Sequence, residues 1–223
     1  MSNDVSAVVD ITIGSEQASG VLIAPDEVLT VAHIISSIGA TASITLSTGA
    51  VLAGVATHAA EAPAGATEII GTIPNDYAVI HLNTTAPTWM PLTLGVTDGM
   101  AATKIGYPGT VIAGQTIATG HQASTAVTMQ TTQIPGLVVD DHPQAAGSSG
   151  SAIVSNGGVV AIASGADSTY AYDVQMTPST ISNIATWMAT DHMVGSHSAA
   201  AGNADAAYVA QLVGLIQGLP HGV

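Results

Sequence analysis

Cysteine is absent from the 223-residue chain, which excludes a disulfide framework, a thiolate metal site and a cysteine nucleophile. Lysine and arginine are almost absent as well. The chain contains one lysine and arginine in total, 1 against 15 aspartates and glutamates, and its formal net charge is −14. A chain so poor in cations cannot neutralise phosphates, so we expect neither a nucleic-acid partner nor attachment to an anionic membrane surface. No apolar run approaches the ~18 residues of a membrane-spanning helix.

Aromatic residues make up only 3% of the chain and phenylalanine is absent, although 47% of the residues are hydrophobic. The core must therefore be built from Val, Ile, Leu and Ala. With 24 glycines and 10 prolines, the composition favours short strands joined by turns, and the chain is long enough to bury a sizeable core. The N-terminal residues contain neither a basic stretch nor a long apolar stretch, so they do not predict a secretory signal.

Short apolar runs bounded by turn residues recur along most of the chain. Strands of this length at regular spacing are typical of a β-sandwich or a β-barrel. A proline-marked stretch at 86–91 predicts a linker between two halves of similar strand density. The expected strands cover residues 8–13, 20–24, 28–32, 42–47, 78–82, 102–107, 125–131, 152–155 and 159–163.

Helical patterns appear only near the C-terminus. The sequence Thr-Pro-Ser at 177–179 precedes apolar residues at 181, 184 and 188, which is the spacing of one helix face with a proline in the first turn. A linker rich in Gly, Ser and Ala follows at 194–203. The apolar residues at 208, 212, 215 and 219 then predict a short amphipathic helix that docks on the domain rather than on a partner.

Three local patterns carry the residue types used in nucleophilic catalysis. The sequence Leu-Thr-Val-Ala-His at 29–33 places a histidine at the end of a predicted strand. The sequence Asn-Asp-Tyr-Ala-Val at 75–79 places a carboxylate immediately before another strand. The sequence Gly-Ser-Ser-Gly-Ser at 147–151 places a serine between glycines ahead of a third.

The chemistry that unites these patterns is acyl transfer. A serine hydroxyl is a poor nucleophile until a base removes its proton. Histidine suits that role because its ordinary pKa is about 6.5, and a carboxylate behind the ring holds the required tautomer. We therefore expect Ser149 to be the nucleophile, His33 the general base and Asp76 the residue that orients it. The N–H groups of Gly147 and Ser149 would form the oxyanion hole, because a glycine-rich turn presents amides without side-chain bulk.

On these three motifs, in the order His, Asp, Ser, the sequence resembles the chymotrypsin-like serine proteases over residues 5–190. The short gap between Asp76 and Ser149, the absence of cysteine and the Gly-Tyr-Pro-Gly sequence at 106–109 are similar to the bacterial branch that contains the glutamyl endopeptidases. The resemblance implies an all-β fold of two six-stranded antiparallel β-barrels with a C-terminal α-helix, and an active site in the cleft between the barrels.

The resemblance also implies how the chain is divided. His33 and Asp76 would come from the first barrel and Ser149 from the second. The expected units are an N-terminal barrel at 1–88, a C-terminal barrel at 89–176, a helix at 177–193, and a linker with a short helical extension at 194–223.

A substrate-binding strand is a further implication of the resemblance. Ser164 matches the serine whose hydroxyl supports the triad aspartate, and Ser164, Gly165 and Ala166 would pair with the substrate backbone as an added strand. Ala163 stands where the glutamyl enzymes place a histidine, and Gln144 where they place a threonine. The resemblance therefore does not extend to their pocket for an acidic side chain. Two alternatives stay open, a neutral pocket for small or medium side chains and steering of basic substrates by the acidic field.

Together these residues predict a serine endopeptidase that acts on a peptide or protein and uses no cofactor or metal. Family members activated by cleavage carry an aspartate where this chain has Ser148, and the chain begins almost at its first strand, so we expect no zymogen switch of that type. The resemblance and the charge-poor surface imply secretion. The alternatives are a non-catalytic protease-fold module that binds peptides or a partner, and an esterase that uses the same site.

The remaining histidines form no recognised ligand spacing with one another or with a carboxylate. They are interpreted as surface or loop residues, at 58, 81, 121, 142, 192, 197 and 221. Asp140 and Asp141 are interpreted as a solvated loop pair, because no calcium-loop pattern surrounds them. The oligomeric state is left open.

Overall fold

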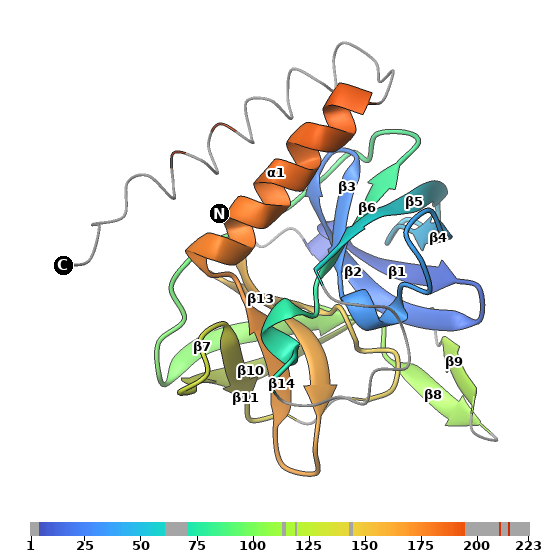
Figure 1. The fold of residues 1–223 in the computed structure, drawn as a ribbon. Coiled ribbons are helices and arrows are strands. Elements are labelled where there is room, and N and C mark those ends of the chain that lie inside the picture. Colours follow the sequence, from blue (N-terminus) through green and yellow to red (C-terminus); the bar gives the residue numbers. More distant parts are fainter. Residues whose placement is uncertain are drawn as a thin grey trace.

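The computed structural model describes residues 5–60, 71–112, 115–118, 120–142 and 145–194, together with the isolated positions 210 and 214. The described residues form two closed six-stranded barrels and one α-helix (Figure 1). The predicted fold class is therefore confirmed. The short helix predicted from the apolar residues 208–219 lies outside the described residues, apart from those two positions, and so does the predicted site residue Gln144.

The first barrel closes in the strand order β1-β2-β3-β6-β5-β4, with every neighbouring pair antiparallel. Strands β3 and β6 are direct neighbours in this order. Glu27 pairs with His81 at one end of their ladder and Thr30 pairs with Ala78 at the other. The strands are β1 (Val8–Ile13), β2 (Glu16–Ala24), β3 (Glu27–Thr30), β4 (Thr41–Thr45), β5 (Val51–Ala59) and β6 (Ala78–Leu82).

The second barrel closes in the order β10-β11-β14-β13-β12-β7. A separate two-stranded hairpin, β8 (Gly109–Ile112) with β9 (Gln115–Ala118), follows β7. The strands of the barrel are β7 (Met100–Gly106), β10 (Ala123–Thr131), β11 (Leu137–Asp140), β12 (Ala152–Ser155), β13 (Gly158–Ala166) and β14 (Ala171–Gln175).

Three barrel strands were not predicted from the sequence, namely β5, β11 and β14. Strand β5 contains Gly54, where a Cβ atom would lie 2.7 Å from the side chain of Ile80, so small size is needed there and the apolar pattern is broken. Strands β11 and β14 contain Asp140 and Asp173, both fully buried. A buried carboxylate interrupts an apolar run, and for that reason neither strand stands out in the sequence.

The largest apolar cluster is continuous between the two barrels. It fills the first barrel with Val, Ile, Leu and Ala side chains, and it extends into the second barrel through residues such as Ile105, Ile162 and Val174. A smaller cluster around Met129 and Ile153 fills the rest of the second barrel. A core without phenylalanine is closed by these β-branched and aliphatic side chains, as the composition predicted.

Helix α1 (Pro178–Val194) begins directly after the second barrel and packs against β5 and β6 of the first (Figure 1). The Thr177 hydroxyl accepts the N–H of Thr180 at 3.1 Å, which is a typical N-terminal cap. The predicted apolar face is confirmed, since Ile181, Ile184 and Met188 are fully buried. Within the part of the chain described here, no helix is long and apolar enough to cross a membrane.

Polar contacts fix the C-terminal half of α1. Asp191 accepts hydrogen bonds from the Thr57 hydroxyl at 2.9 Å and from His58 Nε2 at 3.1 Å. The His58 ring stacks on Trp187 with ring centroids 5.4 Å apart. From the sequence, His58 was predicted to be a surface or loop residue. Its contact with Trp187 could not be predicted, because helix α1 lies more than a hundred residues away from His58 in the sequence.

A buried group of charges lies in the second barrel. Lys104, the only Lys or Arg in the chain, is 7% exposed and forms an ion pair with the fully buried Asp140. Burial raises the pKa of Asp173 well above its usual range; Lys104 opposes this shift and the Asp140 carboxylate adds to it. The prediction of Asp140 as a solvated loop residue is therefore wrong, because β11 turns this side chain inward, whereas Asp141 is exposed.

Candidate active site

His33 stands just beyond the end of β3. The short 3₁₀ helix η2 (Ala32–Ile34) turns the chain there, while its neighbours Ala32 and Ile34 are buried. The two buried neighbours fix the backbone, and the His33 side chain keeps 30% of its surface exposed. An imidazole anchored at its backbone and open at its outer edge is suited to proton transfer with a bound molecule.

Asp76 ends the 3₁₀ helix η3 (Ile73–Asn75), immediately before β6. Its Oδ1 atom accepts the backbone N–H of His33 at 2.8 Å, and its Oδ2 atom lies 2.7 Å from His33 Nδ1. The Ser164 hydroxyl donates to the same Oδ2 atom. Both carboxylate oxygens are therefore engaged, and the carboxylate holds the position of the His33 backbone as well as that of its ring.

Ser149 lies in the turn that leads into β12. Its Oγ atom is 3.1 Å from His33 Nε2. Gly147 and Gly150, on either side of Ser149, both have φ of +80°, which glycine adopts without the steric cost that a Cβ adds. A Cβ atom at Gly150 would lie 2.0 Å from the carbonyl oxygen of Ser19. Backbone geometry therefore requires glycine at both positions, and close packing against the first barrel also requires it at Gly150.

The three predicted residues form one hydrogen-bonded row, Asp76–His33–Ser149. His33 and Asp76 flank β3 and β6 of the first barrel, and Ser149 precedes β12 of the second. The row thus crosses between the barrels, as the resemblance implied.

Ser19, a buried residue of β2, was not predicted from the sequence as part of the site. Its backbone N–H donates to the carbonyl of Ser149 at 2.7 Å, and its hydroxyl donates to the carbonyl of Gly147 at 3.2 Å. The same hydroxyl accepts the N–H of Tyr107 at 2.8 Å. Ser19 therefore ties the turn of the second barrel to the first barrel. No local pattern marks this role, since a serine inside a strand carries no motif.

The peptide planes around Ser149 are fixed by hydrogen bonds. The carbonyl of Ala146 accepts the N–H of Gly109 at 2.6 Å, and the carbonyl of Ser148 accepts the N–H of Ser151 at 2.9 Å. In a trans peptide the next N–H points away from its carbonyl, so the N–H groups of Gly147 and Ser149 point away from these partners. Neither N–H donates a hydrogen bond to any residue that the structure describes.

The pKa of Asp76 is lowered from its usual value. Burial alone would raise it, but the hydrogen bonds and positive charge of His33, together with the hydrogen bond from Ser164, outweigh burial. A carboxylate with a lowered pKa stays ionised when the nearby imidazole gains a proton. The site therefore favours the charge separation that general base catalysis creates.

We expect Asp76→Asn to remove a pH-dependent part of the stability. The pKa of Asp76 is lower in the folded chain than its ordinary value of 3.8, so the ionised carboxylate stabilises the fold above that value. This contribution is lost as the pH falls from 3.8 through the lowered pKa. Urea unfolding at a series of pH values should show the variant less stable than wild type near neutral pH, with a difference that shrinks in acid.

The control for this measurement is Glu16→Gln, which removes an exposed carboxylate outside the row. Its effect should be small at every pH. A stability difference between wild type and Asp76→Asn that is constant from neutral pH into acid would contradict the expectation.

The predicted substrate-binding residues lie at the end of β13. The pairing of β12 with β13 reaches only Ile162, whereas Gly165 and Ala166 pair with β14. No described strand pairs with the other edge of residues 164–166. Ala163 is fully buried, while Ala166 is exposed. These residues therefore present one open strand edge beside Ser149, whose hydroxyl also lies 3.5 Å from the Ser164 carbonyl.

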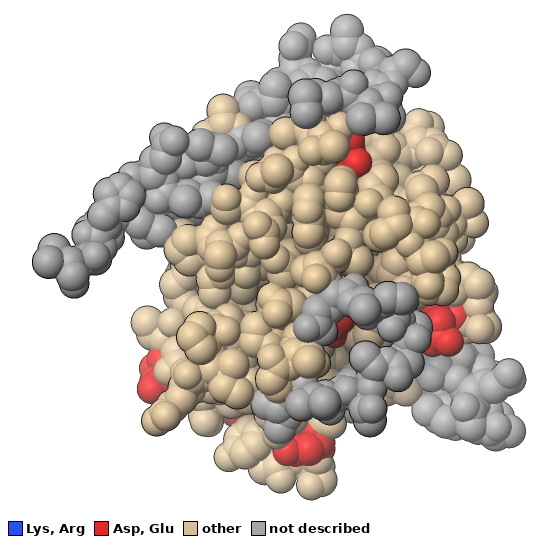
Figure 2. Space-filling model, in the orientation of Figure 1, with Lys and Arg blue, Asp and Glu red and all other residues tan. Residues whose placement is uncertain are grey.

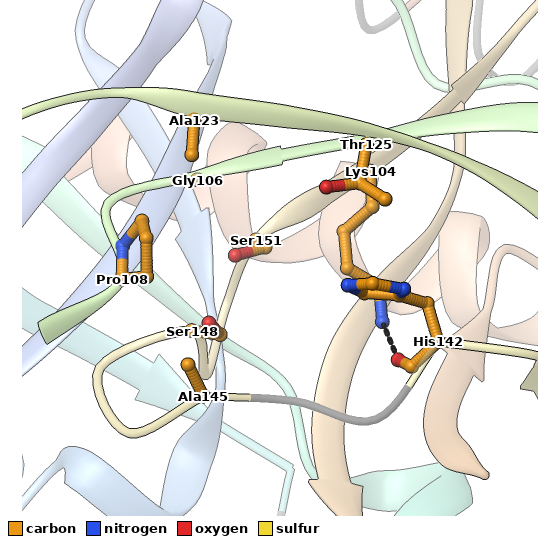
Figure 3. Close-up of a pocket in the computed structure, with 9 residues that line it drawn as sticks. All are labelled: Lys104, Gly106, Pro108, Ala123, Thr125, His142, Ala145, Ser148 and Ser151. Carbon is orange, nitrogen blue, oxygen red and sulfur yellow. Dashed lines mark hydrogen bonds between the residues drawn. The ribbon is translucent and has the colours of Figure 1, made fainter.

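A pocket of about 150 Å³ lies on another side of the Ser149 turn (Figure 3). Ala145, Ser148 and Ser151 contribute to it from the turn, and Lys104 lies beside His142. Its remaining lining residues are Gly106, Pro108, Ala123 and Thr125. The pocket is lined neither by the row Asp76–His33–Ser149 nor by the open edge of β13, so it is not the predicted substrate site.

Comparison with solved structures gives the same fold. A Glu endopeptidase in complex with MPD has a TM-score of 0.64 at 21% identity, over 81% of this chain and 89% of that chain. The serine endoprotease from Yersinia pestis has a TM-score of 0.59 at 19% identity, over 86% of this chain and 62% of that one. The scabies mite inactivated protease paralogue S-D1 has a TM-score of 0.63 at 14% identity, over 88% and 95%.

Comparison of sequences identifies the family. No curated protein matches the chain. Residues 18–162, however, match the trypsin-like peptidase domain, and this range contains all three residues of the hydrogen-bonded row. The chain is therefore a member of the trypsin-like peptidase family.

Proposed function

We propose that the protein is a serine endopeptidase that cleaves peptide bonds through an acyl-enzyme. The observation that carries the proposal is the row Asp76–His33–Ser149, with 2.7 Å between Oδ2 and Nδ1 and 3.1 Å between Nε2 and Oγ. These distances suit successive proton transfer and orientation of the base.

In the proposed reaction, Ser149 Oγ attacks the carbonyl carbon of the scissile bond and its proton passes to His33 Nε2. Asp76 accepts the hydrogen bond from Nδ1–H and stabilises the imidazolium. His33 then gives its proton to the departing amine as the C–N bond breaks. Water then hydrolyses the ester. His33 takes a proton from the water as the water oxygen attacks the acyl carbon, and His33 gives this proton to Ser149 Oγ as the C–Oγ bond breaks and the carboxylic acid product leaves.

The negative charge on the carbonyl oxygen needs donors that are already in place. We assign this role to the N–H groups of Gly147 and Ser149. The hydrogen bonds of the Ala146 and Ser148 carbonyls support the assignment, because they hold both peptide planes in one orientation. The substrate backbone would add to the open edge of β13 at Ser164–Ala166.

No charged group at position 148 is needed in this proposal. Ser148 is 8% exposed, and its backbone N–H and carbonyl bond to Ala145 and Ser151 within the turn. Because the turn is held by backbone contacts and by Ser19, the proposed enzyme is active without a newly freed N-terminal amine.

A fluorophosphonate probe tests the proposal directly, since it forms a covalent bond only with an activated serine. We expect labelling of the wild-type protein at Ser149, identified by mass spectrometry, and no labelling of Ser149→Ala. Ser155→Ala is the matched control and should label normally, because the Ser155 hydroxyl donates to the Ala101 carbonyl instead of a histidine. Absence of labelling in folded wild-type protein would refute the proposal.

A second candidate is a non-catalytic module that binds peptides. The similarity to an inactivated protease paralogue of the scabies mite supports this second candidate, since it shows that the same fold also occurs in a protein without protease activity. This candidate predicts peptide binding that is unchanged by Ser149→Ala, together with no probe labelling. If the probe labels Ser149, so that the peptidase proposal holds, cleavage profiling with a peptide library would establish whether wild type prefers small neutral or basic side chains before the cut.

A further inference from the structure

A second group of polar side chains is buried at the opposite end of the β3–β6 ladder from the active site. Asp26 and Glu27 are 2% and 0% exposed, and His81 is 8% exposed. Each offers a candidate ligand atom, and these atoms lie within 4.8 Å of one another. His81 Nδ1 is 2.8 Å from Glu27 Oε1. The prediction of His81 as a surface or loop histidine is thus wrong, because β6 is buried along its whole length.

A fourth side chain reaches this group from helix α1. His192 Nε2 lies 3.9 Å from Glu27 Oε1, and its side chain is only 14% exposed. The rings of His81 and His192 meet edge to face with centroids 5.9 Å apart. The four side chains therefore come from the β2–β3 turn, β3, β6 and α1, and only the fold brings them together.

No lysine or arginine side chain balances the negative charge of the two carboxylates in this group. Two adjacent carboxylates are buried here, and the only Lys or Arg of the chain lies in the other barrel, paired with Asp140. The Oδ1 atom of Asp26 is buried and has no hydrogen-bond partner among the described residues. Buried carboxylates require pairing or coordination by a cation. The nearby donors that could complete a cation site are the two histidines.

We propose that Asp26, Glu27, His81 and His192 form a binding site for a divalent transition-metal ion of the Zn²⁺ type. Two nitrogen and two carboxylate ligands in a closed site match the preferences of Zn²⁺ and do not match Ca²⁺, which prefers oxygen ligands alone. Ligand atoms of one tetrahedral Zn²⁺ lie about 3.3 Å apart. The separations from Glu27 Oε1 to His81 Nδ1 and to His192 Nε2, 2.8 Å and 3.9 Å, lie on either side of this value. His192 lies outside the group of three whose candidate ligand atoms are all within 4.8 Å of one another, so a bound ion would draw its side chain closer to the other ligands.

The site would serve structure and not chemistry, because four protein ligands leave no open position for a substrate. A bound ion would join α1 to strands β3 and β6. The proposal is independent of the peptidase proposal, because metal binding can be measured without any turnover.

The test begins with full-length protein freed of metal by a chelator. Competition against a chromophoric chelator should give one Zn²⁺ site per chain. At free Zn²⁺ about a hundredfold above Kd, the unfolding midpoint should rise by roughly 5–10 °C. Co²⁺ in the same site should give the intense visible absorption of a four-coordinate ion.

Two variants address the ligands. Asp26→Asn, which keeps the side-chain shape, should weaken Zn²⁺ binding by more than about a hundredfold, and His192→Gln should do the same from the edge of the site. His121→Gln removes an exposed histidine and should leave affinity unchanged. Circular dichroism of the metal-free variants checks folding, and His192→Gln decides the matter if Asp26→Asn does not fold.

Several results would overturn the proposal. They are a midpoint that Zn²⁺ does not move, an affinity that neither ligand variant lowers, an equal loss of affinity in His121→Gln, and greater stabilisation by Ca²⁺ than by Zn²⁺. The first result would assign the group to a histidine–carboxylate hydrogen-bond network that needs no metal.

Discussion

Replacing Ser149 with alanine is expected to lower kcat on a peptide substrate by about 10⁴–10⁶-fold, while the fold and substrate binding persist. The hydroxyl at 3.1 Å from His33 Nε2 is the group whose oxygen would form the acyl bond. Without it, the proposed oxyanion donors and the proposed substrate-binding edge of β13 remain, so water can still hydrolyse a bound peptide at a small residual rate. Steady-state kinetics on a fluorogenic peptide would measure the change.

Combining His33→Ala with Ser149→Ala tests whether the two residues act together in catalysis or contribute to the rate independently. His33→Ala alone should cost about as much as Ser149→Ala, and the double variant should cost no more than either, because the residues act as a unit. Additive losses would contradict the proposed mechanism. Full activity in Ser149→Ala would move the chemistry to a different group.

Replacing Lys104 with methionine is expected to cost about 3–5 kcal/mol of the free energy of unfolding. Methionine fills similar space, but it leaves Asp140 fully buried without its ion-pair partner. It also removes the hydrogen bond from Lys104 Nζ to the His142 carbonyl at 3.3 Å (Figure 3). The unfolding midpoint should fall by roughly 6–20 °C. The expected loss of free energy is a large share of the free energy of unfolding of a typical domain.

The double variant Lys104→Met, Asp140→Asn shows whether charge or shape is responsible. A neutral amide at 140 removes the uncompensated charge, so we expect it to recover a large part of the loss. Asp141→Asn combined with Lys104→Met is the control, because Asp141 is exposed, and it should recover nothing. A mild effect of Lys104→Met would mean that the buried ion pair contributes little.

The sequence supported the prediction of the fold and of the three row residues because each has a local cause. Short apolar runs mark strands, glycines mark the turn at Ser149, and the residue order matches a known family. The carboxylate Asp76 and the imidazole of His33 follow from motifs at strand ends. Their separation of 2.7 Å depends on the closure of the first barrel, which no local pattern specifies.

Other features depend on contacts between distant segments. Ser19 touches the Ser149 turn across the two barrels, and His192 reaches Glu27 from the C-terminal helix. Asp140 and Asp173 are polar residues in buried strands, compensated in part by a lysine on another strand. Sequence patterns describe neighbours along the chain, so these pairings became visible only in three dimensions.

The acidic composition has a visible outcome at the surface. On the face in Figure 2, acidic side chains are scattered among uncharged ones and no basic side chain appears, in keeping with the burial of Lys104. Substrate steering by this surface would favour cationic peptides and weaken as salt is added.

Ser19 joins the first barrel directly to the turn of the second barrel that carries Ser149. Its amide and hydroxyl hold the carbonyls on either side of Ser148, so a small rotation of one half against the other would withdraw the proposed nucleophile Ser149 and the proposed anion-binding amides together. Compounds that bind between the two halves and turn one against the other should therefore block the proposed peptidase activity without occupying the proposed substrate-binding edge of β13.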